Sequence, residues 1–231
     1  MSTGAEQALW AERQAARPVR VGDTIRRPAY HRSAYVDALL LHLAEAGFAG
    51  APRPLGYDDH DRQILTFIEG EVPGGEGPRR LSDARIRSAT ELIRAFHDAT
   101  VSFAMRADQE VVCHGDLGPH NTVFRGEQAV AIIDFDDDVG PGRRVDDFAQ
   151  AVWGFADLTD PAVALTEQRR KTRLMCDIYG GITPAEVVEA LTARFRRALD
   201  HHRAAGLTGA VQVFDDLLTW MARCGGQIAH G

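Results

Sequence analysis

The sequence predicts an α+β fold with two lobes, in which a short β-rich N-terminal lobe precedes a larger, mainly helical C-terminal lobe with an embedded β-hairpin. Two patterns support this fold class. Apolar and polar residues alternate around turn-forming stretches over residues 18–70, with one helical segment between them. From residue 82 onward, apolar residues recur at helical spacing, and strand-like apolar runs interrupt them between 111 and 133. The 231 residues are enough for two small lobes around a proper core.

The first strands of the small lobe, which is predicted to span residues 1–70, lie close to its start. The stretch PVRVGDTIRRP at 18–28 alternates around Gly22-Asp23, as a short hairpin does. The residues before this stretch are polar and show no clear period, so a helix and a loose arm both remain open for residues 1–18.

One helix and a second strand pair complete the small lobe. Ser33 is the predicted N-cap of the helix, and Gly47 is its predicted end. The apolar residues between them stand at helical spacing: Val36, Leu39, Leu40 and Leu43. The stretch at 51–70 predicts a strand, a turn at 58–61 and a second strand.

A stretch rich in proline and glycine separates the two lobes. The residues EVPGGEGPRR at 71–80 place the predicted boundary between residues 70 and 71, so the larger lobe is expected to span 71–231. The glycines at 73–77 follow the last strand of the small lobe, and we interpret them as a linker.

Outside its hairpin, the larger lobe is predicted to be helical nearly to its end. A helix is expected to begin at Ser82, because four apolar residues after it line one face: Ile86, Ala89, Ile93 and Phe96. Later helices are predicted to start at Asp160-Pro161 and at Thr183-Pro184, where Glu186 stands at capping-box spacing. Helices are predicted to stop at Gly206 and at Gly225.

The composition excludes several classes of protein. The net charge of −7 leaves no surplus of basic side chains for general nucleic-acid binding, although it is compatible with a cationic partner. The three cysteines have no CxxC spacing, which argues against a disulfide framework and a zinc site. No apolar stretch has the length of a membrane span and no secretory signal is evident at the N-terminus, so we expect a cytoplasmic protein with reduced thiols. The oligomeric state stays open.

The candidate chemistry lies in the stretch VVCHGDLGPHNTVFRGEQAVAIIDFDDD at 111–138. Asn121 and Asp134 stand next to the two strands of the predicted hairpin, one at the start of the first strand and one at the end of the second. Both therefore lie near the same end of the hairpin. Asp116 lies on the loop just before Asn121, so three oxygen-bearing side chains are expected at one edge.

Carboxylates gathered in this way repel one another and raise each other's pKa, and a divalent cation relieves this. Mg²⁺ prefers a few hard oxygen ligands and keeps room for waters and phosphates, which fits one aspartate and one asparagine. Asp116, which is not needed as a ligand, is free to accept a proton from a hydroxyl group. The loop H-G-D-L-G-P-H-N and the following Asp134-Phe135-Asp136 have the spacing of the phosphoryl-transfer template.

These motifs resemble those of the aminoglycoside phosphotransferase family, which has a protein-kinase-like fold. The resemblance implies an ATP- and Mg²⁺-dependent kinase that transfers a phosphoryl group to the hydroxyl of a small molecule. It implies that Asp116 is the catalytic base and that Asn121 and Asp134 bind Mg²⁺. Asp147 of the segment Asp147-Phe148-Ala149 would support the catalytic loop and cap its own helix, and His114 would hold the loop by hydrogen bonds.

The resemblance also implies a nucleotide-binding connector at LTFIEG, residues 65–70. Its backbone would hold adenine, with the Thr66 carbonyl and the Ile68 amide, on either side of Phe67, as the candidate hydrogen-bonding groups. The choice between ATP and GTP stays open.

The sequence departs from the family pattern in the small lobe. It has no Gly-rich phosphate loop before the first helix, since Gly22 stands alone, and the family's phosphate-binding lysine is missing, because the sole lysine, Lys171, lies in a late helix. Arg26 or Arg27 is the candidate replacement, and strand alternation allows only one of them to face the cleft. The glutamate that usually pairs with the lysine has no clear match, although Asp37 lies beside the expected place.

Alternative interpretations remain open at this point. Without the lysine and the phosphate loop, the chain could be a non-catalytic, kinase-like binding protein, and a metal-dependent hydrolase is a weaker third reading. His120 is as consistent with a position in the cleft as with one outside it. The run at 136–138 is interpreted as a solvated turn, although Asp136 could assist a metal through water. The acceptor substrate is not specified by the sequence.

Overall fold

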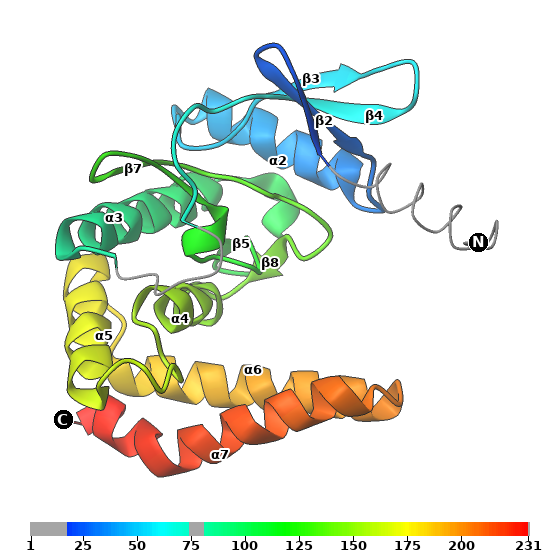
Figure 1. The fold of residues 1–231 in the computed structure, drawn as a ribbon. Helices are drawn as coiled ribbons and strands as arrows, with labels where there is room; N and C mark the ends of the chain where they lie inside the picture. The colour runs from blue at the N-terminus through cyan, green and yellow to red at the C-terminus, as the bar shows by residue number, and fades with distance from the viewer. Residues whose placement is uncertain (1–17, 74–80, 231) are drawn as a thin grey trace, which may run out of the picture.

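A computed structural model describes residues 18–73 and 81–230. The chain forms a small upper lobe and a larger, mainly helical lower lobe, as the sequence predicts (Figure 1). The predictions for residues 1–17 and for most of the 71–80 linker, including Gly74 to Gly77, concern residues outside the described ones, and the lobe boundary at 70/71 stays a prediction.

The small lobe contains an antiparallel sheet of four strands with the order β1-β2-β4-β3. The strands are β1 (Val19–Val21), β2 (Thr24–Pro28), β3 (Pro54–Tyr57) and β4 (Arg62–Thr66). Helix α2 (Ser33–Glu45) lies beside this sheet (Figure 1), and its buried Leu39, Leu40 and Leu43 belong to the hydrophobic core. Since β1 and β2 pair Val21 with Thr24, the turn falls at Gly22-Asp23, where the hairpin was predicted.

The large lobe begins with α3 (Asp83–Thr100), whose apolar face is buried as expected. Three short elements follow, η1 (Ala104–Arg106), β5 (Val111–Cys113) and η2 (Pro119–Asn121). The predicted hairpin is β6 (Thr122–Arg125) paired with β7 (Gln128–Ile132). One pairing was not anticipated, because β5 pairs with β8 (Gly140–Gly142) on the far side of the Asp-rich turn.

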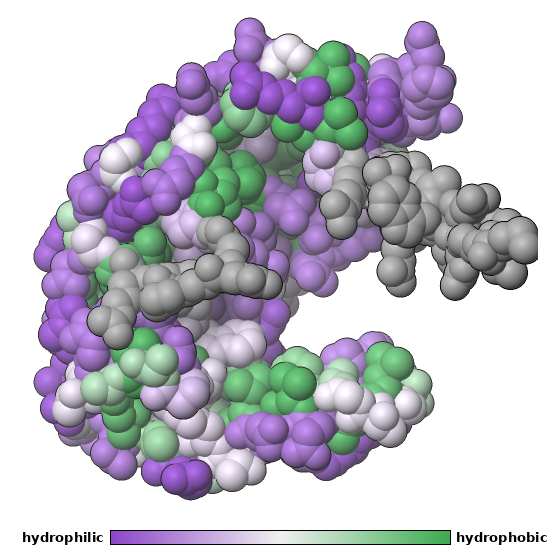
Figure 2. Space-filling view, viewed as in Figure 1, coloured by the Kyte–Doolittle hydropathy of each residue, from purple (hydrophilic) through white to green (hydrophobic). Residues whose placement is uncertain are grey.

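Four helices complete the large lobe: α4 (Arg144–Phe155), α5 (Leu165–Tyr179), α6 (Pro184–Ala204) and α7 (Thr208–His230). The last two form a long antiparallel hairpin that projects from the molecule (Figure 1). The space-filling view shows a deep hollow between this hairpin and the rest of the protein, with hydrophobic surface on the hairpin (Figure 2). None of the helices among the described residues is long and apolar enough to cross a membrane.

Helix boundaries confirm some predictions and correct others. Thr183 caps α6 with the predicted capping box, and Ser82 caps α3. Ser33 is not an N-cap, because α2 already begins there and its hydroxyl accepts a hydrogen bond from the Tyr30 N–H at 2.7 Å.

Two further helix-end predictions are wrong. Asp160 does not start a helix but closes a turn onto the Ala162 N–H at 2.8 Å, and α5 begins only at Leu165. Gly225 does not stop α7, which continues through it, because the missing side chain lets α7 lie against Val188 of α6.

Candidate active site

The loop between β5 and η2 is held in place by one buried carboxylate. Asp147, in the first turns of α4, accepts hydrogen bonds from the backbone N–H groups of His114 and Gly115, both at 2.8 Å. The His97 Nε2 lies 3.0 Å from the same carboxylate. Burial alone would raise the pKa of Asp147, but the hydrogen bonds from His97 and the loop outweigh it and lower the pKa. Asp147 therefore supports this loop as an anion, but the predicted helix-capping role is wrong, because Arg143 occupies the N-cap of α4.

His114 and Gly115 explain the sharp turn of this loop. The His114 side chain is fully buried, with its Nε2 at 2.9 Å from the Ile133 carbonyl and its Nδ1 accepting from the Asp116 N–H at 3.3 Å. Gly115 has a φ of +87°, and a Cβ there would lie 2.6 Å from the Asp138 carbonyl oxygen. The loop thus lies directly against the Asp-rich turn after β7.

The loop directs Asp116 toward three hydrogen-bond donors. His120 Nε2 and Asn121 Nδ2 both lie 3.0 Å from its Oδ2, and Gln150 Nε2 of α4 lies 3.4 Å from its Oδ1. The hydrogen bond with His120 is the largest influence, and the net result is a lowered pKa for Asp116. The carboxylate is therefore ionised and oriented, and its Oδ1 carries the fewer donors.

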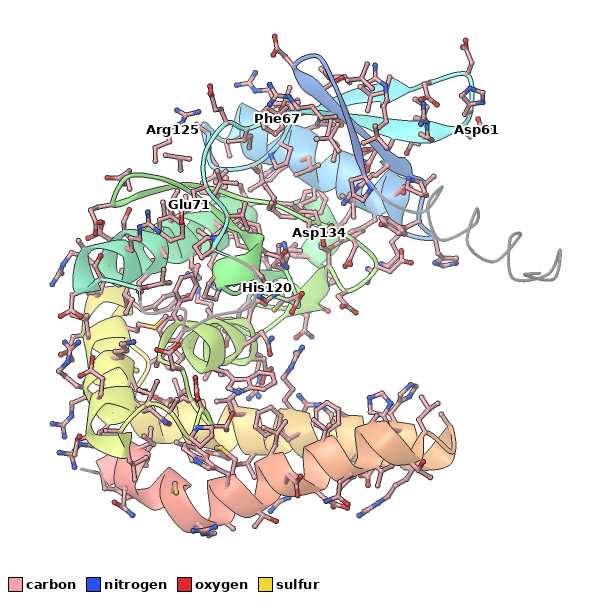
Figure 3. All side chains as sticks on the ribbon, viewed as in Figure 1. Asp61, Phe67, Glu71, His120, Arg125 and Asp134 are labelled. Carbon is pink, nitrogen blue, oxygen red and sulfur yellow. The ribbon has the colours of Figure 1, made fainter. Side chains whose placement is uncertain are left out.

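Asp134 lies beside Asn121 at the end of β7. The Ile133 N–H donates to the Asn121 carbonyl at 2.9 Å, which joins the residue before Asp134 to the end of the loop that carries Asp116. Asp134 has a φ of +66° and keeps its side chain 49% exposed, so its carboxylate faces open space. Asp134 and His120, both labelled in Figure 3, line the same cavity.

The donor set fits a magnesium ion that is shared with a nucleotide. No group of three His, Cys, Asp or Glu side chains suited to a metal occurs within the described part of the chain. One carboxylate from Asp134 and one amide oxygen from Asn121 leave most of the coordination sphere to phosphate oxygens and water, as Mg²⁺ prefers.

The two candidate arginines of β2 point to opposite faces of the sheet. Arg27 is 3% exposed, and its Nη1 lies 3.4 Å from Asp134 Oδ1 while its Nη2 donates to the Phe135 carbonyl. Arg26 instead lies near Asp58, at 3.8 Å, and donates to the Thr24 hydroxyl. Burial lowers the pKa of Arg27, but a guanidinium stays protonated in a protein, so Arg27 brings a fixed positive charge to the cleft.

A cavity of about 350 Å³ extends from this charge cluster to the connector between the lobes. One end of this cavity is lined by polar side chains: Arg27, His120, Asn121 and Asp134. The other end is lined by the connector residues Thr66, Phe67, Ile68 and Gly70. Apolar side chains also line the cavity, among them Ile25, Leu65, Val123 and Ile133. The Phe67 N–H is already bonded to the Asp23 carbonyl at 2.9 Å, whereas the Ile68 N–H has no backbone acceptor among the described residues. Gly70 is required where the connector crosses the hairpin, because a Cβ would lie 2.5 Å from Val123.

The acidic run after Phe135 is largely turned to solvent. Asp137 accepts from the Arg32 N–H at 2.8 Å, and Asp136 accepts from the Asp138 N–H at 2.9 Å. Burial, together with the neighbouring Asp136 and Asp116, raises the pKa of Asp138. These aspartates shape the turn between β7 and β8.

The predicted residues Asp116, Asn121 and Asp134 lie together in the structure, but the sequence carries no signal for the side chains that support them. Gln150 and His97, which contact Asp116 and Asp147, carry no motif signal because each is one polar residue within a helical pattern. Gln63 was missed as well, although it lies directly opposite Arg27 in the β2–β4 ladder. Only the strand register shows that pairing.

Comparisons with known proteins agree with this geometry. A family model described as the phosphotransferase enzyme family matches residues 99–179. A trifolitoxin immunity protein from Rhizobium leguminosarum bv. trifolii is 34% identical over 184 residues, which cover 70% of this chain and 69% of that protein.

Solved structures share the fold at low sequence identity. The GDP complex of aminoglycoside 2′-phosphotransferase-IIIa is 14% identical, with a TM-score of 0.59 over 87% of each chain. A choline/ethanolamine kinase family protein from Mesorhizobium loti is 16% identical, with a TM-score of 0.53 over 93% of this chain and 89% of that one. The fold and site define a kinase-like phosphotransferase, and the chain belongs to the phosphotransferase enzyme family.

Proposed function

We propose that the protein is an ATP- and Mg²⁺-dependent kinase that phosphorylates a hydroxyl group of a small molecule. The observation that carries this proposal is the meeting of Asp116, Asn121 and Asp134 beside the cavity, with the Arg27 guanidinium at Asp134. A solved relative of the same fold is a streptomycin–ATP ternary complex of APH(2″)-IIa, with a TM-score of 0.52 and 14% identity. Nucleotide use by this chain is inferred from its own cavity together with that likeness.

Adenine would lie against the apolar wall of the cavity at the connector, with the Thr66 carbonyl and the Ile68 N–H as its hydrogen-bonding partners. The phosphates would extend toward Arg27 and Asp134 at the other end. When bound by Asn121 and Asp134, Mg²⁺ would neutralise charge on the phosphate oxygens.

Asp116 would act on the acceptor. Its Oδ2 is occupied by two donors, so Oδ1 is the oxygen placed to accept the hydroxyl proton. As the proton moves to Asp116, the acceptor oxygen bonds to the γ-phosphorus, and the bond from phosphorus to the β–γ bridging oxygen breaks to release ADP. The lowered pKa of Asp116 keeps it ionised at neutral pH, and its weak basicity suits a role that is mainly orientation of the hydroxyl.

A second candidate function is immunity against a toxic compound. It is favoured by the likeness to the trifolitoxin immunity protein, which extends over about two thirds of both chains. Protection could follow from phosphorylation of the compound or from binding without turnover, and the second route corresponds to a non-catalytic, kinase-like binding protein.

Isothermal titration with Mg-ATP tests the nucleotide claim. The wild-type protein should bind, and Asp134→Asn should weaken binding tenfold or more, because the metal loses its only carboxylate ligand (roughly the loss of one strong charged contact). Asp137→Asn is the matched control, since this aspartate lies on the same turn and its hydrogen bond within the described residues is to the Arg32 backbone, and it should bind like wild type. Absence of binding to the wild-type protein would refute the proposal.

Asp116→Asn separates the catalytic from the non-catalytic reading. If the protein protects a sensitive cell by phosphorylation, this substitution abolishes protection while Mg-ATP still binds. Protection that persists in Asp116→Asn would favour binding without turnover. Phosphate release from ATP without an acceptor, at more than a trace rate, would instead favour a hydrolase.

A further inference from the structure

Arg27 is held by a chain of hydrogen bonds that runs across the small lobe. Its Nε donates to Gln63 Oε1 at 2.7 Å, and both side chains are almost fully buried. Gln63 Nε2 in turn donates to Asp37 Oδ1 on α2 at 2.5 Å. Tyr57 completes the chain by donating its hydroxyl proton to Asp37 Oδ2 at 2.7 Å.

The direction of each bond fixes the orientation of the Gln63 amide. Asp37 is a carboxylate and only accepts, so it binds the NH₂ end of the amide, and Arg27 only donates, so it binds the oxygen end. Arg27 and Gln63 are also direct cross-strand partners, which places their side chains side by side. A flipped amide would set its NH₂ group against the Arg27 donor and its oxygen against the Asp37 carboxylate, so both hydrogen bonds would be lost.

The same contacts leave one guanidinium nitrogen for the cleft. Gln63 holds Nε and the Phe135 carbonyl holds Nη2, while Nη1 meets Asp134 at the edge of the cavity that both residues line. A lysine could not replace this arrangement, since its single ammonium group cannot reach all three partners in the planar geometry of a guanidinium.

We propose that Gln63, oriented by Asp37, is a positioning residue that presents Nη1 of Arg27 to the phosphates of a bound nucleotide. The inference rests on the proposed function, because it requires a nucleotide in the cavity. Asp37 on α2 then acts on Arg27 through the neutral amide of Gln63 rather than by pairing with it directly. Arg27 keeps its positive charge for the ligand, since Asp134 is its nearest carboxylate and is itself half exposed.

The experiment removes both hydrogen bonds of the Gln63 amide without adding a charge. In Gln63→Met, a side chain of similar length neither accepts from Arg27 nor donates to Asp37, so Arg27 loses its support on this side. Arg26→Gln is the control on the opposite face of the same strand.

Binding of Mg-ATP and of adenosine is measured for each variant by calorimetry, with the melting temperature recorded without ligand. Gln63→Met should weaken Mg-ATP about tenfold, the scale of one hydrogen bond to a charged group. Adenosine, which has no phosphate, should bind all variants equally well, and Arg26→Gln should bind Mg-ATP to within about threefold of wild type. If Gln63→Met does not fold, Gln63→Leu takes its place and should show the same loss for Mg-ATP only.

Two results would overturn the inference while leaving the proposed function intact. One is Mg-ATP binding by the Gln63 variants that equals that of wild type. The other is an equal loss for adenosine and Mg-ATP, which would show general damage to the lobe. A wild-type protein that binds no nucleotide would remove the inference together with the proposed function.

Discussion

The substitution Asp147→Asn tests whether one buried carboxylate holds the loop that carries Asp116. Asp147 accepts three hydrogen bonds, from the N–H groups of His114 and Gly115 and from His97. Asparagine has a single acceptor oxygen, and its NH₂ group would face at least one of these buried donors. The side chain is wholly buried, so water cannot replace the lost acceptor.

The magnitude follows from those contacts. A buried donor without an acceptor costs about 1–3 kcal/mol, and the remaining bonds lose the strength that the carboxylate charge gives them. We therefore expect Asp147→Asn to lower the free energy of unfolding by about 2–4 kcal/mol. In a chain of this size, that corresponds to a fall in melting temperature of roughly 10 °C.

Urea unfolding followed by circular dichroism measures this effect, with Asp146→Asn as the control. Asp146 is the neighbouring residue on α4, but it pairs with Arg143 at the surface, so its substitution should cost less than about 1 kcal/mol. Equal stabilities of the two variants would refute the role assigned to Asp147.

The pH dependence provides a further check. The pKa of Asp147 is lowered in the folded protein, so its contribution is fully present above the unfolded value of about 3.9 and is lost as the pH falls through the folded pKa. The stability difference between wild type and Asp147→Asn should therefore be largest above about pH 4 and shrink in stronger acid.

Two other substitutions give distinct outcomes. Gly115→Ala should destabilise the protein by clearly more than Gly126→Ala, because a Cβ at Gly115 collides with the Asp138 carbonyl. Gly126 is the control, since it also has a positive φ but nothing lies within 4 Å of its missing Cβ. Left-handed strain costs about 1–2 kcal/mol in both variants, so equal unfolding free energies would contradict the close approach at Gly115. His120→Ala should raise the pKa of Asp116 toward its ordinary value, because the largest contribution to its lowering is removed, and a carboxyl ¹³C titration that shows no rise would contradict the assigned hydrogen bond.

Local patterns predicted most of the fold. The hairpin at residues 18–28, the buried face of α3 and the capping box of α6 depend on neighbours in the sequence, and these predictions are confirmed. The pairing of β5 with β8 depends on a distant contact of the stretch Gly-Pro-Gly, which carries no strand signal. The helix end predicted at Gly225 failed because the packing of α7 on α6 outweighs the low helix propensity of glycine.

The candidate site shows the same division. The spacing from Asp116 to Asn121 and the strand before Asp134 predict their convergence, since both follow from one hairpin. Strand alternation predicted that a single arginine of β2 faces the cleft, but the choice of Arg27 depends on the registry of β2 with β4. The hydrogen bond from Gln63 to Asp37 joins a strand to a helix and has no signature in the sequence.

A crystal structure of the protein with Mg²⁺ and a non-hydrolysable ATP analogue tests the central claim most directly. The account predicts adenine at Thr66 and Ile68, the metal against Asn121 and Asp134, a phosphate oxygen within hydrogen-bond distance of Arg27 Nη1, and the γ-phosphate next to Asp116. A nucleotide bound elsewhere, or an empty cavity at saturating nucleotide, would contradict it.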